Sequence, residues 1–489
     1  MTEPLPSAHL FTHEELSQRE LSSAEQVDHL VARRGAVDSS GPGLNTLIEL
    51  NPEAMTIAME LDAEVRDGVT RGPLHGLTIA VKDNIDTADA MLTTAGSLAL
   101  ADTRPSRDAA LISRLRAAGL VVLGKANMSE WANLRSPHST SGWSARGGLT
   151  RNPWDPMRSA GGSSSGSAAA VAAGVAPLAV GTETDGSIIC PASYNGVVGI
   201  KPTVGLLSTV GIIPVSHSQD APGPMARSVR LVAALLDAMA GTDHFLTACE
   251  DVNIAGVRVG VVRDHFGAHT GADAVTEKAI DALATTGAVI VDPVPAVAFP
   301  EPNNDEDDQA LAVLLHEFQH GLTAYLSTRP PGGPRTLAEI VAFNHTNADA
   351  ELTWFGQEYL ERAALLPGLD SSAYQTARAN TLRMAREDGL DAVFGAHEVD
   401  VLVSPAFPPA PVNDLVLGDS VGPGGECTTA SAIAGYPILS VPIGFVHGLP
   451  VGLAITGPAN SEQMLLRVAR ALEAQLGLLD AGALVPPTL

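Results

Sequence analysis

Three residues that together can catalyse acyl transfer lie at separate points of this 489-residue chain: Lys82 in AVKDN, Ser163 in GGSSSGS and Ser187 in GTETDGSIICPAS. A lysine that is held neutral can take the proton of a serine hydroxyl, so a Ser/Lys arrangement can perform the chemistry of a Ser-His-Asp triad. Lys82 ends an apolar β run, and the two serines flank one short helical pattern. Judged from residue types alone, each of the three could also be a surface cation or a turn residue.

A second candidate is a serine nucleophile elbow. Residues 162–166, GSSSG, match the pattern G-x-S-x-G with Ser164 at its centre. This motif requires a β-strand immediately before the serine and a helix after it. The helical pattern is present, but the preceding TRNPWDPMRSAG contains two prolines and no apolar run. The missing strand argues against Ser164 as the nucleophile.

A third candidate is a zinc site. His316, Glu317 and His320 form H-E-x-x-H in the helical pattern LAVLLHEFQHGLTAYL, where histidines at i and i+4 share one face. A zincin also needs a third ligand, and no H-x-x-G-x-x-H extension follows. The sequence favours an amphipathic helix with its polar histidines on the outer face, and a zinc hydrolase that uses His316 and His320 is the remote alternative.

The elements that must position these residues predict an α/β fold. From Gly76 onward short β runs alternate with helices, as in LTIAVKD, AALISRLRAAG and LVVLGK, and the alternation recurs over residues 276–292 and 371–407. Two apolar β runs, 436–445 and 449–456, precede a last helix that Asn460 is expected to cap. The pattern indicates a sheet that is largely covered by helices.

Residues 1–70 are predicted to form an N-terminal helical layer. Thr12 with Glu15, and Ser22 with Glu25, have capping-box spacing before apolar periodic runs. We expect this layer to pack on a catalytic domain that comprises residues 71–489.

Composition argues against several classes of protein. The net charge is −26 from 29 Lys+Arg and 55 Asp+Glu, which is unsuited to gripping a phosphate backbone. Cys190, Cys249 and Cys427 match neither a disulfide framework nor a structural zinc site. The amino terminus lacks the features of a secretory signal, and no apolar stretch reaches the roughly 20 residues that a bilayer requires. We expect a soluble, cytoplasmic protein that binds neither nucleic acid nor membrane.

The segment GGSSSGSAAAVAAGVAPLAVGTETDGSIICPASYNGVVGIKPTVG resembles the two signature blocks of the amidase signature family. The similarity continues through GKANMSEWAN, SGWSARGGLTRNPWD and GYPILSVPIGFVHGLPVGLAITG, and covers about residues 70 to 480. It implies a single-domain α/β fold in which helices cover both faces of a central mixed β-sheet. It also implies hydrolysis of amide C–N bonds without a cofactor or a metal.

The resemblance assigns roles to particular residues. It implies a Ser-cisSer-Lys triad with Ser187 as nucleophile, Ser163 as bridging serine and Lys82 as base. A lysine titrates near about 10.4, so a neutral base near pH 7 requires burial, which the apolar LTIAV run before Lys82 fits. Trp131 and Trp143, with the helical region 310–360, are expected to line the substrate pocket. The implied oxyanion hole consists of the backbone N–H groups of Thr184, Asp185, Gly186 and Ser187.

Residues 182–189, which we call the nucleophile loop because the resemblance places the nucleophile there, depart from the common family pattern TDTGGSIR. Glu183 replaces the usual aspartate, Asp185 the first glycine and Ile189 the arginine, so the family's Asp/Arg ion pair cannot form as such. We expect the Asp185 side chain to face away from the oxyanion; the alternative is contact with the amide nitrogen of the substrate.

This version of the loop is similar to that of bacterial peptide amidases, which remove the C-terminal amide of peptides. It differs from the loop of the glutamyl-tRNA amidotransferase subunits that carry the amidase fold. The expected ligand is a small-molecule or peptide amide, and the oligomeric state stays open. The alternative is a glutaminase-type subunit of a tRNA-dependent amidotransferase.

Overall fold

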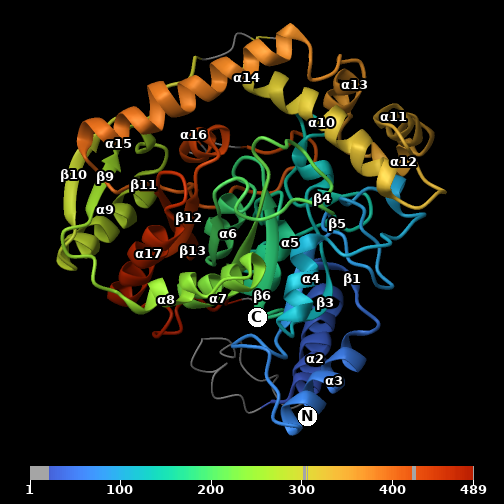
Figure 1. Cartoon of the computed structure of the whole chain (residues 1–489), viewed down its shortest axis with the longest axis horizontal. Coiled ribbons are helices and arrows are strands. Elements are labelled where there is room, and N and C mark those ends of the chain that lie inside the picture. The colour runs from blue at the N-terminus through green and yellow to red at the C-terminus, as the bar shows by residue number, and fades with distance from the viewer. Residues whose placement is uncertain (1–20, 301–303, 305–306, 421–425, 488–489) are drawn as a thin grey trace.

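A central mixed sheet organises the molecule. The computed structural model describes residues 21–300, 304, 307–420 and 426–487. The strands of the sheet are β1 (Leu47–Leu50), β2 (Thr78–Lys82), β3 (Val121–Ala126), β6 (Leu178–Glu183), β7 (Val198–Lys201), β8 (Ala221–Ala226), β9 (Arg258–Val262), β10 (Val289–Val294), β11 (Val401–Pro405), β12 (Ile438–Val446) and β13 (Leu449–Thr456). They lie in the order β1-β3-β2-β6-β8-β7-β12-β13-β11-β9-β10 (Figure 1). The predicted α/β fold is confirmed.

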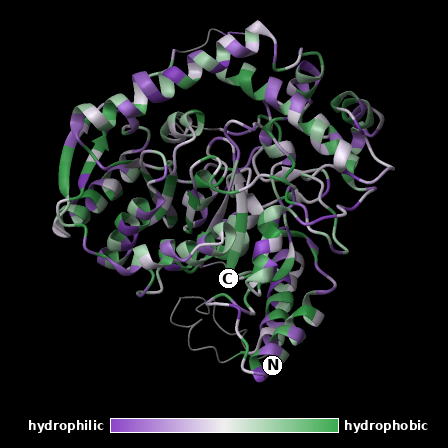
Figure 2. Cartoon of the chain, in the orientation of Figure 1, coloured by the Kyte–Doolittle hydropathy of each residue, from purple (hydrophilic) through white to green (hydrophobic). Residues whose placement is uncertain are grey.

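Helices flank the sheet. One apolar cluster joins it to α4 (Ala110–Ala117), α7 (Val229–Ala240), α8 (His244–Glu250), α9 (Thr270–Thr285) and α17 (Glu462–Leu476). A second cluster joins it to α2 (Ser23–Arg34), α3 (Ala54–Arg66), α5 (Ser165–Ala172) and α6 (Ile189–Asn195). Figure 2 shows hydrophobic residues concentrated around the central strands and α5.

Strand β2 determines which face of the sheet receives Lys82. Side chains alternate between the two faces of a strand. Ile79 and Val81 belong to the first apolar cluster, whereas Ala80 belongs to the second. Lys82 therefore shares the face of Ala80, on the side where α5 packs, and is completely buried.

A group of helices spans the top of the molecule in Figure 1 as an arch. Its long members are α10 and α14, and α16 lies beneath them. None of the described helices is both long and apolar enough to cross a bilayer. The elements of this region are α10 (Gln309–Thr328), α11 (Leu337–Thr346), α12 (Ala348–Glu351), α13 (Glu358–Ala364), α14 (Ser372–Ala385), α15 (Asp391–His397) and α16 (Glu426–Ala434).

The N-terminal segment is partly helical. Ser22 and Glu25 form the predicted capping box before α2, while Thr12 and Glu15 lie outside the described residues. The prediction of a purely helical layer is incomplete, because β1 pairs antiparallel with β3 and forms one edge of the sheet. Its four residues are too few to give a recognisable pattern. The division at residue 70 stays a prediction.

The predicted cap of the last helix is wrong. Ser461 occupies the N-cap position of α17, and Asn460 adopts a left-handed φ of 62°. The backbone N–H of Asn460 donates to Thr203 Oγ1 at 2.8 Å. Asn460 thus serves a tight turn that the sequence pattern does not distinguish from a cap.

Helix α5 packs closely because its side chains are small. A Cβ added at Gly166 would lie 2.4 Å from Thr46 O and 2.5 Å from Asn127 N, both backbone atoms. Glycine is needed here for the close approach of two backbones.

We expect Gly166→Ala to lower the free energy of unfolding by about 1–3 kcal/mol, because overpacking forces backbone shifts. Gly395→Ala in α15 is the matched control, since its Cβ would meet nothing within 4 Å. Alanine there should leave stability unchanged or raise it by up to about 1 kcal/mol. Urea unfolding followed by circular dichroism measures both. Wild-type stability in Gly166→Ala would contradict the packing argument.

Candidate active site

Lys82 lies among neutral oxygen atoms at the end of β2. Its Nζ is 2.8 Å from Ser163 Oγ, 2.9 Å from Ser164 Oγ, 2.9 Å from Thr182 Oγ1 and 3.0 Å from Thr182 O. Burial lowers the pKa of Lys82 to about 7, although the charges of Glu183 and Asp220 oppose this shift. A buried amine that is partly neutral at pH 7 can accept a proton from the hydroxyl of Ser163.

Ser163 and Ser164 play different structural parts. The Gly162–Ser163 peptide bond is cis, and the hydroxyl of Ser163 contacts Lys82. Ser164 is the N-cap residue of α5, and none of the described strands ends directly before it. Its Oγ donates to Thr182 O at 3.0 Å and is fully buried. Ser164 therefore lacks both the strand and the exposure that a nucleophile elbow requires.

Ser187 lies between β6 and α6 and is 7% exposed. Its carbonyl oxygen accepts a hydrogen bond of 3.1 Å from the backbone N–H of Ser164. Its hydroxyl makes no hydrogen bond to any described residue, so the structure joins Lys82 to Ser163 but does not join Ser163 to Ser187. The backbone N–H groups that lead to Ser187 are available to bind a ligand. Within the described residues, no acceptor is bonded to the N–H groups of Thr184, Asp185, Gly186 or Ser187.

The side chain of Glu183 anchors the nucleophile loop through hydrogen bonds to its backbone. Its Oε2 accepts from the N–H groups of Ile188 at 2.6 Å and Ile189 at 2.9 Å. Burial raises the pKa of Glu183, and the charge of Lys201 opposes that rise. The longer side chain thus reaches the backbone at residue 189, so the loop is held without an arginine side chain there.

A chain of hydrogen bonds ties the loop to the arch. Thr184 Oγ1 donates to Asp220 Oδ1 at 2.6 Å, and Asp220 Oδ2 accepts from the N–H of Ser216 at 3.0 Å. The hydroxyl of Ser216 donates to Glu317 Oε2 at 2.6 Å, and Tyr374 donates to Glu317 Oε1 at 2.7 Å. The glutamate of H-E-x-x-H is therefore occupied as an acceptor between α10 and α14.

The two histidines of that motif are placed differently from the sequence prediction. His316 is buried rather than on the outer face, with Nδ1 2.9 Å from Pro367 O and its ring 5.7 Å from that of Tyr374. His320 is exposed, as expected. Across residues 21–300, 304, 307–420 and 426–487, no three His, Cys, Asp or Glu side chains are arranged to hold a metal ion.

A cavity of about 250 Å³ adjoins the nucleophile loop. Asp185 and Gly186 form part of its wall. The carboxylate of Asp185 is turned toward α16, where it accepts from Thr428 Oγ1 at 2.6 Å and Thr429 Oγ1 at 2.9 Å. Sequence reasoning assigned none of the other wall residues, because several lie in the family-like segments without a recognisable chemical role and the rest come from a distant segment without a motif. They include Asn133, Ser141, Cys190, Tyr194, Phe407 and Asp419.

Trp131 and Trp143 are both buried outside the described wall of this cavity. Trp131 packs edge-to-face on Phe318 with ring centroids 6.2 Å apart, and Trp143 on Phe355 at 5.1 Å. Their expected contact with substrate stays a prediction.

Comparisons with known proteins agree on one family. The family model described as Amidase matches residues 30–466. The chain is 35% identical over 461 residues to a probable amidase of Arabidopsis thaliana, covering 90% of this chain and 84% of that protein. It is 34% identical over 496 residues to a glutamyl-tRNA(Gln) amidotransferase subunit of Chloroflexus aurantiacus, covering 94% of each.

The fold is similar to that of a solved bacterial enzyme. The native peptide amidase from Stenotrophomonas maltophilia superposes with a TM-score of 0.88 at 44% identity, covering 97% of this chain and 98% of that one. A complex of the peptide amidase with the competitive inhibitor chymostatin gives the same TM-score at 45% identity, covering 96% and 97%.

Proposed function

This chain belongs to the amidase signature family and is an amide-hydrolysing enzyme, and we propose that it releases ammonia from carboxamides, C-terminal peptide amides above all. One observation carries the proposed chemistry. The buried amine of Lys82, whose pKa is about 7, lies 2.8 Å from a serine hydroxyl, and its hydrogen-bond partners among the described residues are all neutral oxygen atoms. Peptide amides are proposed because the chain is 44% identical to a peptide amidase over nearly its whole length.

In the proposed reaction, Ser187 Oγ attacks the amide carbonyl carbon. Its proton passes to Ser163, while the Ser163 proton moves to neutral Lys82. The N–H groups between Thr184 and Ser187 would stabilise the oxyanion. Collapse breaks the C–N bond, and the same route returns the proton to the departing ammonia. Water then attacks the acyl-enzyme, which yields the carboxylic acid and restores Ser187.

The proposed proton transfer requires the hydroxyl of Ser187 to come within hydrogen-bond distance of the hydroxyl of Ser163, and we propose that substrate binding brings them together. Catalytic hydrogen bonds are often long in unliganded enzymes and tighten when substrate binds.

We also propose a cytoplasmic location. The chain's three cysteines are free thiols, as is usual for proteins of a reducing compartment.

We expect Ser187→Ala and Lys82→Ala each to lower kcat by at least about 10³-fold, because one removes the acyl acceptor and the other its base. Lys278→Ala, an exposed lysine on α9, is the matched control and should keep wild-type turnover. Ammonia release from a peptide amide measures all three. Wild-type turnover in Ser187→Ala or Lys82→Ala would refute the triad, and loss of activity in His320→Ala would favour zinc chemistry.

The pH profile should report the ionisation of Lys82. Its pKa lies near 7, so the amine is mostly ammonium at pH 6 and mostly neutral at pH 8. We expect kcat/KM to rise about tenfold per pH unit below pH 7 and to level off above it. Asp220→Asn removes a charge that raises the Lys82 pKa, so it should shift this limb to lower pH. A profile that is flat from pH 5 to 8 would contradict a lysine base.

The alternative function is that of a glutaminase-type component of an amidotransferase, which the 34% identity to such proteins supports. A component of that kind would hydrolyse glutamine, and a peptide amidase would prefer peptide amides. We expect the purified single chain to release ammonia from peptide amides without ATP or tRNA, at a kcat/KM at least about 10²-fold above that for glutamine. A preference for glutamine, or dependence on tRNA, would favour the alternative.

A further inference from the structure

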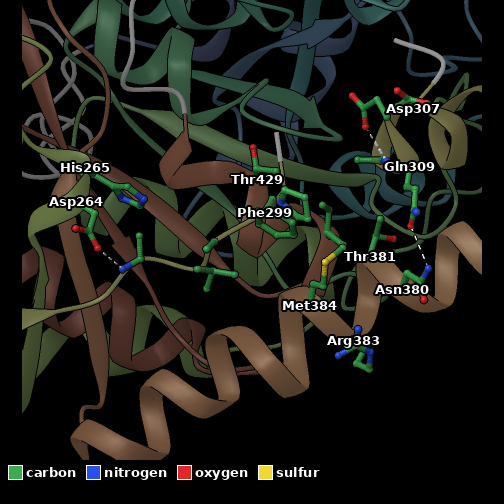
Figure 3. A pocket seen from close by; sticks show the side chains of 17 residues that line it. Asp264, His265, Phe299, Asp307, Gln309, Asn380, Thr381, Arg383, Met384 and Thr429 are labelled. Atoms are coloured by element: carbon green, nitrogen blue, oxygen red, sulfur yellow. Dashed lines mark hydrogen bonds between the residues drawn. The ribbon is translucent and has the colours of Figure 1, made fainter. Parts of the chain in front are cut away.

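A second and larger cavity lies beneath the arch. Its volume is about 720 Å³, and its wall is formed by residues 264–265, by the chain before α10, by α10, by α14 and by α16 (Figure 3). We call it the arch cavity and define it by Phe299, Gln309, Thr381, Met384, Thr429 and Ile433. None of these residues belongs to the proposed catalytic machinery.

The arch cavity and the cavity beside the nucleophile loop share one wall residue. Thr429 lines both the arch cavity and the 250 Å³ cavity beside the nucleophile loop. Its Oγ1 donates to Asp185 Oδ2 at 2.9 Å. A substrate chain that runs from a carbonyl at Ser187 toward the arch cavity would pass Thr429.

We propose that the arch cavity binds the peptide segment that precedes the C-terminal amidated residue of the substrate. This inference rests on the proposed amidase function and specifies its substrate as a peptide of several residues. The two volumes support it. Ligand pockets typically measure about 300–1,000 Å³, so the smaller cavity suits one residue, whereas the arch cavity has room for several.

The wall of the arch cavity has the chemistry to hold a peptide. Phe299 and Met384, which Figure 3 labels, offer apolar surface to side chains, and so does Ile433. Asn380 Nδ2 donates to Gln309 Oε1 at 3.2 Å, and two primary amides carry further donors and acceptors that a peptide backbone can use. Apolar side chains and hydrogen-bonding groups therefore both line the cavity, and a peptide offers partners to both.

The charges around the cavity restrict the peptide further. The wall contains three carboxylates, those of Asp264, Asp307 and Asp308, and one guanidinium, that of Arg383. Asp264 and Asp308 accept hydrogen bonds from backbone N–H groups, which leaves their negative charge in place, whereas Arg383 is paired with Asp388. Peptides with a neutral or cationic amino-terminal part are therefore favoured over anionic ones.

The test compares two substrates that share the same amidated residue: an acetylated amino acid amide and an acetylated tetrapeptide amide. For the wild type we expect the tetrapeptide amide to have at least about a tenfold higher kcat/KM, mainly through KM. Met384→Trp narrows the arch cavity and should lower kcat/KM for the tetrapeptide amide at least about fivefold, while the short amide stays within about twofold.

Met59→Trp is the matched control, because Met59 is exposed on α3 and should tolerate tryptophan with both substrates. Turnover of the short amide also shows that Met384→Trp is folded, and Phe299→Ala provides a second variant that should affect only the long substrate. Equal kcat/KM for the two substrates in the wild type, or an equal loss for both in Met384→Trp, would overturn the proposal. Absence of turnover with every amide would instead refute the proposed function.

A third substrate tests the charge of the cavity. Succinylation places a carboxylate at the amino end of the same tetrapeptide amide. We expect its kcat/KM to fall at least about threefold below that of the acetylated peptide, and Asp264→Asn to reduce this difference. Equal values for the two peptides would overturn the proposed preference for neutral or cationic peptides.

Discussion

The exclusion of water and carboxylates from Lys82 is the constraint on which the site depends. Lowering its pKa from 10.5 to about 7 corresponds to a free energy on the order of 5 kcal/mol. Contact with a carboxylate would return the lysine to its charged form. The surroundings avoid this, because strand alternation turns Lys82 toward the small residues of α5 and its contacts are hydroxyl and carbonyl oxygens. The density of glycine, serine and alanine in residues 161–187 follows from this requirement.

The carboxylates that anchor the nucleophile loop oppose the lowering of the Lys82 pKa. Glu183 and Asp220 hold the loop by accepting from its backbone and from Thr184, yet their negative charges raise the pKa of Lys82. The same burial that disfavours the ammonium also raises the pKa of both carboxyl groups, that of Asp220 to about 6. The ability of Asp220 to stabilise the ammonium is thereby reduced as the pH falls toward 6. Loop anchoring and lysine neutrality can therefore coexist within one buried volume.

The sequence predicted what depends on local pattern. The strand that ends at Lys82, the helix after Ser164 and the capping box at Ser22 follow from periodicity and short motifs. Errors arose where a distant segment decides the outcome. The sequence pattern predicted that His316 lies on an exposed polar face of its helix. In the structure Tyr374 of α14 packs against the ring of His316, which is buried. Cavity residues such as Asp419 lie more than 200 positions from the nucleophile loop, so no spacing rule could place them there.

The origin of the two groups of residues separates reactivity from selectivity. Lys82, Ser163 and Ser187 come from β2 and the segment around α5, where close packing leaves little freedom for change. The arch cavity is instead lined by α10, α14, α16 and a connecting segment, whose side chains face open space. If the arch cavity binds the acyl part of the substrate as proposed, changes there would alter which acyl group fits without disturbing the buried amine. Within this chain, the shape and acidity of the arch are the features that would turn general amide hydrolysis into selection of peptides.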